Sequence, residues 1–405
     1  MSRMRNRLVF LAAAMFFVHG SRLFATEFFG VTATGGGNTV TVGGSNLINL
    51  TDNLINEQSS FASLAGTNLT GTLSYGGIPN ALVFTENAAQ TSATITIPIT
   101  GFTKTFVGTS SSNLQSQIKD FLKTDAEQAY AQFLEAVNVR SAVAMIDGNP
   151  QASTALIADD LFTRFGLHNE QSTELVSAGG GTYLGVNFNG GMIRADDLNG
   201  TWGEFTFNTG VRLTDNVGLC FGTAVDYRDE AASDAYTLAE EVALPITFIN
   251  NRGDGISWQV TPWGFGGIAA SYDQVAGGIL VGGGATSSLA LHMGPVTLSL
   301  ADQINYDHGV DIAYDGYGFD TNVDQWIFKN GVDGAFQFPG TPIFVDASIA
   351  YSNFLRNAAV PNFWSPSAGV GLAFGGHSSL RFSYAGDFGK DYNANGGQVA
   401  LVLSY

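Results

Sequence analysis

The sequence predicts an all-β membrane protein, a twelve-stranded antiparallel transmembrane β-barrel preceded by a small α+β module. Three observations lead to this prediction. Only 13% of the 405 residues are charged, about half the usual share, whereas 45% are hydrophobic and 51 are glycine. No run of 18 apolar residues follows residue 25, so a spanning helix is not predicted. Finally, the C-terminal half alternates apolar and polar residues, which suits a closed barrel in lipid.

The N-terminus carries the pattern of a secretory signal peptide. Arg3, Arg5 and Arg7 precede the apolar segment Leu8–Val18, and a short polar stretch leads to Ala25. We expect cleavage after Ala25, so residues 1–25 are assigned to the signal peptide. An uncleaved anchor helix is the alternative, although the apolar segment is short for one. Cleavage removes four arginines and no acid, which changes the net charge from −18 to −22 and disfavours nucleic acid as a partner.

Cys220 is the only cysteine, so no intramolecular disulfide is possible. Its neighbours in sequence are Leu219 and Phe221, which would point to the opposite face of a strand. Cys220 therefore falls on the small-residue face, where a packing role is the ordinary interpretation and a reactive thiol is the alternative.

Residues 26–178 form the predicted N-terminal region, which begins with a flexible or extended lead around the glycine run at 35–37. Four short strands follow, at Leu69–Tyr75, Ala81–Glu86, Ala93–Ile97 and Phe102–Val107. Capping-box patterns at Ser112 and Thr124 predict two helices, and a third begins at Asn149-Pro150 and ends at Gly166. We expect this α+β module on the periplasmic side of the barrel or partly inside the pore.

Residues 179–405 form the predicted barrel. At the end of the chain Val399, Leu401, Leu403 and Tyr405 alternate with smaller or more polar residues, the period of a strand with unlike faces. Eleven further runs share this pattern, at 183–188, 205–213, 217–227, 242–248, 256–260, 279–291, 296–306, 326–338, 343–351, 370–374 and 380–384. Polar side chains inside and apolar ones outside predict a cylinder in hydrocarbon. A large soluble sandwich or a lipocalin-like barrel is the alternative.

The predicted connections alternate in length. Short ones at 214–216, 250–255, 294–295, 339–342 and 375–379 separate long polar ones at 228–235, 307–321, 353–366 and 387–397. Short turns on one rim and long loops on the other are typical of outer-membrane barrels, whose long loops lie outside the cell. An even number of strands puts both ends of the barrel segment on the short-turn, periplasmic side.

Residues 181–405 therefore resemble a bacterial outer-membrane β-barrel. The terminal strand, with Val399, Leu401, Leu403 and Tyr405, resembles the aromatic-ended signal that the outer-membrane barrel assembly machinery reads in that family. The barrel after an exported, partly helical region also resembles the translocator domain of autotransporters, although residues 26–110 are short and unrepetitive for a passenger. The resemblance implies a bacterial outer-membrane location, with outer-membrane lipid and the assembly machinery as partners.

Charged residues on the inward faces of the strands suggest a pore for small solutes. Arg212, Lys329, Asp333, Asp346 and Arg381 would set a transverse field across the lumen. Two alternatives stay open. The barrel would be an autotransporter-like translocator that displays or secretes its N-terminal segment, or a structural or adhesive surface protein.

Metal binding and catalysis have weaker signals. Asp391–Gly396 matches the first half of an EF-hand loop, but Val402 stands where the bidentate glutamate belongs, so turn chemistry explains the motif. Loop acids, namely Asp307, Asp311, Asp315, Asp320 and Asp324, would at most bind divalent cations weakly outside the cell. His292 and Ser288 share one strand face, but no nearby carboxylate orients the histidine, so neither an enzyme nor a cofactor is predicted.

Overall fold

The computed structural model describes residues 29–44, 66–76, 78–124, 144–167, 181–195, 198–230, 233–251, 255–271, 276–310, 312–314, 317–319, 323–374 and 378–404, and scattered residues within 50–64 and 129–141. The predicted signal peptide and Tyr405 lie outside this set. None of the helices in the described ranges is long and apolar enough to cross a membrane.

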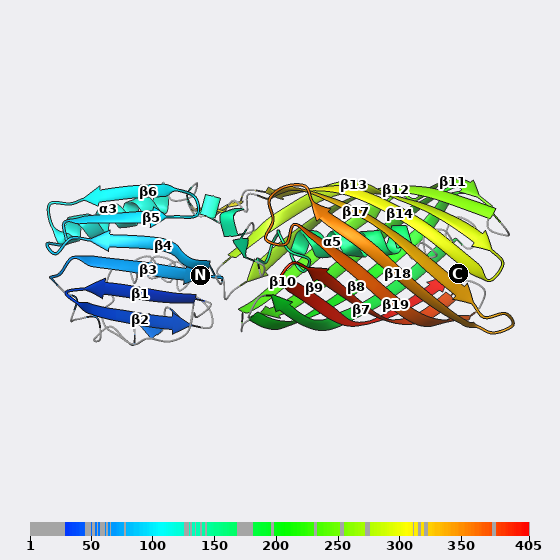
Figure 1. Cartoon of the computed structure of the whole chain (residues 1–405). Coiled ribbons are helices and arrows are strands. Elements are labelled where there is room, and N and C mark those ends of the chain that lie inside the picture. Colours follow the sequence, from blue (N-terminus) through cyan, green and yellow to red (C-terminus); the bar gives the residue numbers. More distant parts are fainter. Residues whose placement is uncertain are drawn as a thin grey trace.

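Six antiparallel strands form the N-terminal sheet: β1 Phe29–Gly35, β2 Asn38–Gly44, β3 Leu69–Tyr75, β4 Ile78–Glu86, β5 Ser92–Ile97 and β6 Phe102–Val107. Their order is β2-β1-β3-β4-β5-β6 (Figure 1). The four predicted strands are confirmed, and residues 29–44 of the lead, predicted as flexible or extended, form two paired strands. The glycine run is a hairpin turn rather than a linker, because Gly36 and Gly37 take positive φ angles of 57° and 84° between two alternating strands.

One face of this sheet packs into a hydrophobic core, because apolar and polar residues alternate along its strands. Val31, Val40 and Phe84 are buried on that face. Helix α3 (Ser111–Thr124) covers the β5–β6 end, with the Phe121 and Phe106 rings 5.4 Å apart. The helix begins where Ser110 Oγ accepts the Asn113 N–H at 3.2 Å, so the prediction of a first helix is confirmed. The second predicted helix falls largely on residues outside the described set.

The barrel contains β7 Thr182–Ala195, β8 Leu198–Thr214, β9 Val217–Glu230, β10 Ser233–Ala243, β11 Ile246–Asn250, β12 Gly255–Ser271, β13 Ala276–Met293, β14 Val296–Val310, β17 Asp324–Gln337, β18 Ile343–Phe354, β19 Asn362–Phe374, β20 Ser378–Gly389 and β21 Tyr392–Ser404. Each strand pairs antiparallel with its neighbours, and β21 pairs with β7 to close the cylinder. A small hairpin, β15 Ile312–Tyr314 and β16 Tyr317–Phe319, lies in the β14–β17 connection. The twelve-stranded barrel is confirmed.

Strands β10 and β11 are two halves of one barrel strand, where the sequence predicted a continuous run over 242–248. Both halves pair with β9 on one side and β12 on the other. The break falls at Leu244-Pro245 because proline has no N–H to donate to the ladder. Two hydrogen bonds bridge the break, from Leu244 N–H to Pro262 O at 2.9 Å and from Gly218 N–H to Pro245 O at 3.0 Å.

Two of the predicted long loops are mostly strand. β9 and β10 extend through most of 228–235, and β20 and β21 occupy most of 387–397, leaving a turn at Lys390-Asp391 in which Asp391 has a φ of 56°. Between β18 and β19 the connection is shorter than the predicted 353–366, since β19 begins at Asn362. These extensions could not be predicted from alternation, because the strand ends lie beyond the apolar belt and carry polar residues on both faces.

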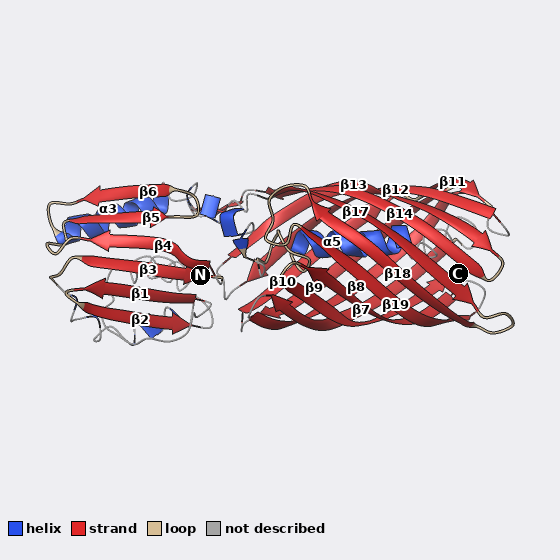
Figure 2. Cartoon of the chain, in the orientation of Figure 1, coloured by secondary structure: helices blue, strands red, loops and turns tan. Residues whose placement is uncertain are grey.

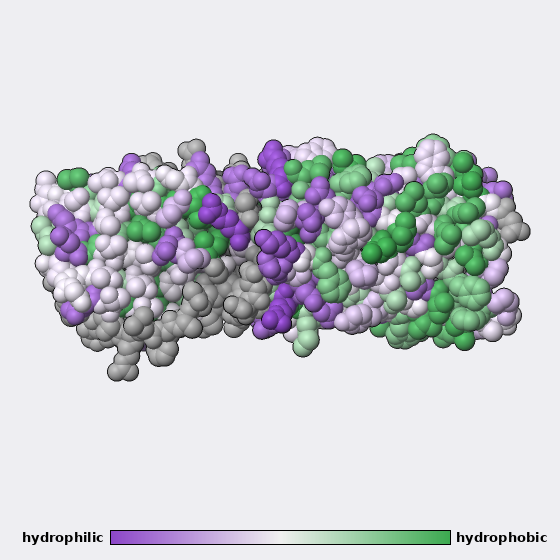
Figure 3. All heavy atoms as spheres, in the orientation of Figure 1, coloured by the Kyte–Doolittle hydropathy of each residue, from purple (hydrophilic) through white to green (hydrophobic). Residues whose placement is uncertain are grey.

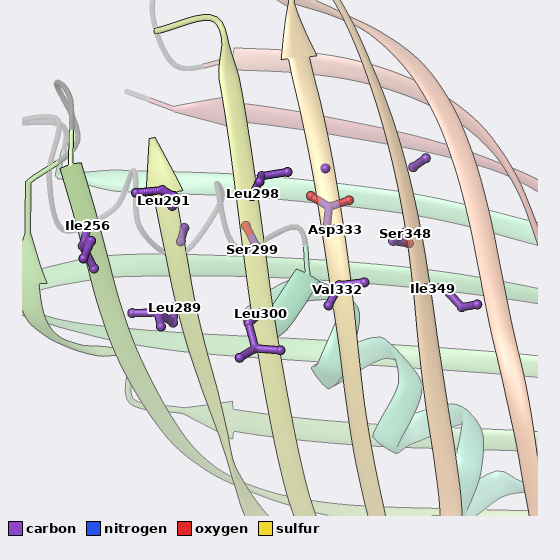
Figure 4. A pocket seen from close by; sticks show the side chains of 13 residues that line it. Ile256, Leu289, Leu291, Leu298, Ser299, Leu300, Val332, Asp333, Ser348 and Ile349 are labelled. Carbon is purple, nitrogen blue, oxygen red and sulfur yellow. The ribbon is translucent and has the colours of Figure 1, made fainter. Parts of the chain in front are cut away.

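The outer surface of the barrel has an apolar belt bordered by aromatic rings. Figure 3 shows hydrophobic residues gathered on the half of the barrel far from the module and hydrophilic residues at the junction. Figure 4 shows part of the belt, where Leu289, Leu298, Leu300, Val332 and Ile349 line a depression across β13–β18. Ring pairs such as Tyr306–Trp326, 4.9 Å apart, and Phe336–Phe338, 5.0 Å apart, lie near opposite rims.

The height of this belt matches a membrane. Trp326 and Phe336 are ten residues apart on β17, or about 33 Å along the strand at about 3.3 Å per residue. A strand tilt of about 40° converts that length to about 25 Å, the height of the apolar band of outer-membrane barrels. The closed barrel and its belt are therefore those of a bacterial outer-membrane protein.

Inside the barrel lies α5 (Ser153–Phe162), continued by a π-helical turn, η2 (Thr163–Leu167), as Figure 2 shows. The third predicted helix is confirmed. The module lies at the rim formed by the β9–β10, β18–β19 and β20–β21 connections, whereas β7 begins and β21 ends at the short-turn rim (Figure 1). The sequence predicts the N-terminal region on the periplasmic side of the barrel or partly inside the pore. Its third helix does lie inside the pore, whereas its six-stranded sheet lies at the rim opposite the short turns, because the chain traverses the lumen before the first barrel strand begins.

Candidate functional site

The candidate site is the lumen, which the chain enters through a docked segment at residues 144–152. Arg228 Nη2 donates to Met145 O at 2.6 Å, and Val360 N–H donates to Gly148 O at 2.9 Å. These partners come from the end of β9 and from the β18–β19 connection. Backbone carbonyls of the segment are thus paired by the barrel rim itself, as burial requires.

Side chains of the same segment also bond to the rim. Gln151 Nε2 donates to Asp387 Oδ2 at 3.0 Å, and Asp147 accepts from Thr154 at 2.8 Å and from Gln325 at 3.3 Å. Burial raises the pKa of the Asp147 carboxyl. The segment is therefore held by β17 and β20 as well as by β9, around much of the mouth.

Three further hydrogen bonds follow the helix down the lumen. Ser153 Oγ and Thr237 Oγ1 are 2.7 Å apart, and Gln303 Nε2 donates to Ala158 O at 2.8 Å. Near the other end, Ser288 Oγ donates to Gly166 O at 2.8 Å, five residues before β13 ends at the short-turn rim. The order of these contacts gives the direction of the chain, from the module end toward the short turns.

A buried ion cluster fastens the lower half of the helix to the wall. Arg164 Nη2 lies 2.6 Å from Glu241 Oε2 on β10, and its Nε lies 3.4 Å from Asp160 Oδ2 one turn earlier. All three side chains are buried. Charges out of water need such close pairing to offset the loss of hydration. The cluster is therefore a strong determinant of where the helix sits.

Lys329 supplies a second ionic contact. Its ammonium forms a salt bridge with Asp159 on α5, and only 1% of the lysine side chain is exposed. The ammonium also lies over the ring of Phe162 at 5.5 Å. Lys329, which was predicted as a charge lining the pore, is therefore paired with the helix.

The other four predicted lumen residues lie in different surroundings. Arg381 forms a bidentate pair with Asp346, at 2.9 and 2.5 Å, and also donates to Gln398 at 3.0 Å. Asp333 is buried on an inward face, whereas Arg212 lies at the short-turn rim and pairs with the exposed Asp215. The structure therefore brings together only Asp346 and Arg381 of the five.

The residues that hold the helix were missed by sequence reasoning. Asp160 and Arg164 are an i,i+4 pair in a helix whose other residues are mostly apolar or small, and Glu241 follows Glu240 on β10 and shares its inward face with alanines. A charged pair inside an apolar helix was the available signal. The partner on β10 could not be found without knowing the register between helix and wall.

We expect the two predicted pore arginines to respond differently to replacement by methionine. Arg212→Met should change the free energy of unfolding by about 0–1 kcal/mol, because Asp215 is almost fully exposed. Arg381→Met should cost about 3 kcal/mol, because it leaves Asp346 buried without its charge partner. Urea titrations of the lipid-reconstituted barrel, read as the heat-modifiable gel shift, measure both. Equal effects would contradict the placement.

The backbone of the helix lies nearest to β13, β14 and β17, and a Cβ at Gly166 would come within 3.0 Å of Ala301. Its side chains also reach the rest of the wall, because Ile157, Leu161 and Phe165 share one buried cluster with residues of β7, β9, β10 and β21. The helix therefore fills much of the lumen at its level.

The terminal strand completes the barrel. β21 pairs with β20 on one side and β7 on the other, and Val399 faces outward with 38% of its surface exposed. Leu401 and Leu403 have the same parity and are half-buried. The assembly signal assigned to Val399, Leu401, Leu403 and Tyr405 thus lies on the closing strand, and its recognition by the assembly machinery stays a prediction.

The fold adds no support to the weak metal-binding and catalytic signals of the sequence. Within the part of the chain that the structure describes, no three His, Cys, Asp or Glu side chains are grouped to hold a metal ion. Asp307 is wrongly predicted as a loop acid: β14 continues through it, and it is buried where Asn305 donates to it at 2.8 Å. His292 lies 3.0 Å from Ser257 and 3.3 Å from Thr297, its neighbours across the sheet.

No protein-family model and no curated protein matches the sequence. Among solved structures, the translocator domain of the autotransporter NalP from Neisseria meningitidis matches with 13% identity and a TM-score of 0.45, covering 62% of this chain and 98% of that one. The β domain of the Bordetella autotransporter BrkA matches with 11% identity and a TM-score of 0.43, covering 56% and 100%. An outer-membrane channel from Pseudomonas putida F1 matches with 11% identity and a TM-score of 0.41, covering 56% and 96%. Translocators and channels are both present, so the similarities do not distinguish the two functions.

Proposed function

We propose that the barrel is an autotransporter-like translocator that displays the six-stranded module outside the cell. The path of the chain carries this proposal. From the module the chain enters the lumen at the rim opposite the short turns, descends as α5, and reaches β7 at the short-turn rim. Outer-membrane barrels have their short turns in the periplasm. A module at the other rim would therefore be on the cell surface.

The contacts of the helix support a displayed module over an open solute pore. Lys329 and Glu241, which a pore would present to passing solutes, are instead paired with Asp159 and Arg164 of the helix. Lumen side chains at the level of the helix, such as Gln303 and Ser288, are 1% exposed. A helix fastened in this way would anchor the module to the barrel after export. Outer-membrane lipid and the barrel assembly machinery are the partners this function requires.

Cysteine labelling on intact cells tests the orientation. The native Cys220 is buried, so it gives little background with a membrane-impermeant maleimide. Ser112→Cys places an exposed thiol on the module, and Asp215→Cys places one at a short turn. We expect Ser112→Cys to react on intact cells and Asp215→Cys to react only after the outer membrane is permeabilised.

The matched pair controls for expression and for thiol reactivity. Denatured samples of both variants should label equally, which calibrates the comparison. Labelling of Asp215→Cys on intact cells, with Ser112→Cys protected, would put the module in the periplasm and refute the proposal.

A further inference from the structure

We infer that the uncovered face of the six-stranded module binds ice, through a two-row array of threonines. On the face opposite the hydrophobic core, each strand contributes two consecutive outward positions to the array, and nearly all of these positions are threonine. The first row crosses the whole sheet in register, one residue per strand: Thr39, Thr34, Thr70, Thr85, Thr94 and Thr105.

A second row runs two residues farther along each strand. Its members are Thr41, Thr32, Thr72, Val83, Thr96 and Thr103, in the same strand order. Eleven of the twelve positions are therefore threonine, and the exception, Val83, keeps the branched shape of the side chain. None of the twelve is charged. An exposed strand surface ordinarily carries lysine or glutamate, so solubility does not explain this composition.

The array is ordered by its own hydrogen bonds. At the β1–β2 end, the hydroxyls of Thr32 and Thr41 are 2.9 Å apart, and those of Thr34 and Thr39 are 3.1 Å apart. At the β5–β6 end, the Thr94–Thr105 pair is 3.0 Å apart. Because β-branched side chains have few χ1 rotamers, such cross-strand pairs fix where each methyl and hydroxyl points.

The geometry is that of a regular lattice. The antiparallel strands β1–β6 lie side by side with nearly aligned axes in Figure 1, so the sheet has little twist, and side-chain ladders of this kind accompany flat sheets. Neighbours in a row are about 4.8 Å apart and the two rows about 6.7 Å apart, given the spacing and rise of strands. The prism face of hexagonal ice repeats at two perpendicular distances close to these.

The chemistry also favours ordered water over other flat ligands. Hydroxyls on this lattice can take the places of water molecules, while the methyl groups between them order the adjacent water. Charged groups, whose tight hydration shells would not fit the lattice, do not occur in either row. The array also has no aromatic side chain on which a sugar ring of a crystalline polysaccharide would stack. On the cell surface, such a face would meet ice directly.

Ice affinity of the full chain tests the inference. The dye-labelled protein in detergent micelles is presented to a slowly growing ice hemisphere, and the protein in the ice is compared with that in the liquid. We expect wild type to be enriched in the ice. The enrichment of Thr70→Lys/Thr94→Lys should be about tenfold lower, because a hydrated ammonium interrupts the middle of the first row. Ser112→Lys/Ser116→Lys adds the same two charges at exposed positions of α3, on the helix side of the module, and should behave as wild type.

A neutral variant, Thr70→Gln/Thr94→Gln, separates lattice mismatch from charge and should also lose enrichment. Exclusion of wild type from ice, or retention of enrichment in both double variants, would overturn the inference. Binding of wild type to crystalline cellulose or chitin instead, or pairing of two copies through this face in light scattering, would also overturn it. The measurement uses purified protein, so its outcome is independent of the orientation test above.

Discussion

Deleting residues 153–167 is expected to convert a nearly closed barrel into an open channel. The deletion removes α5 and η2, which pack against β13, β14 and β17 inside the lumen. A helix with its side chains is about 10–12 Å wide, so we expect mean single-channel conductance to rise by about tenfold or more. Planar-bilayer recordings of the refolded full-length and deleted proteins make the comparison. Equal conductances would show that the helix does not obstruct the lumen.

The deletion also needs a control that keeps the chain length. Replacing the fifteen residues by a Gly/Ser segment of equal length keeps the tether but removes the packed helix. We expect its recordings to flicker between closed and open levels, since a flexible chain would visit the lumen without a fixed position. A conductance as low as that of wild type would mean that any chain in the lumen suffices and that the helix contacts are dispensable for closure.

Arg164→Met is expected to be the most destabilising single substitution in the lumen. It leaves Glu241 and Asp160 buried next to each other without their common cation. Removing one member of a buried ion pair typically costs about 3–5 kcal/mol, and here two carboxylates lose their partner. Urea unfolding in lipid vesicles measures the loss, and bilayer recordings of the same protein would show openings as the helix detaches.

A second variant separates the charge from the shape of the side chain. Arg164→Met/Glu241→Gln removes one of the stranded carboxylates and should recover about half of the lost stability, because pair interactions in contact are not additive. If the single variant unfolds like wild type, the cluster does not determine the position of the helix. Arg212→Met, at an exposed rim pair, is the matched arginine control.

The barrel was predictable because lipid imposes its pattern on each strand separately. Outward residues such as Leu298, Leu300 and Ile304 are apolar regardless of where the strand lies in the barrel, so twelve runs could be counted from the sequence. Above the belt that constraint ends. β9 continues through Arg228 and Asp229, two charged residues on opposite faces, so this stretch has the pattern of a loop. Strand ends beyond the membrane were therefore missed for a physical reason.

The lumen site was less predictable because it depends on contacts between distant segments. Inward parity predicted Lys329 and Arg381 in the lumen, and both side chains are buried, but parity gives no information on the partner. Lys329 pairs with a residue 170 positions earlier, on a helix whose depth in the barrel is set by the whole set of lumen contacts. The threonine array shows the same limit, since each Thr-x-Thr unit is ordinary and only the register of six strands aligns them.

The proposed route through the barrel also constrains the order of folding. The six-stranded sheet is about 24 Å across, with strands about 4.8 Å apart, whereas one helix of about 10–12 Å takes up much of the interior. A completed sheet is too broad for the lumen of the barrel, so on this route the module has to cross as an unfolded chain. The sole cysteine lies in the barrel, so no disulfide can lock the module prematurely. Folding of the sheet outside the barrel would then prevent the chain from moving back through the lumen.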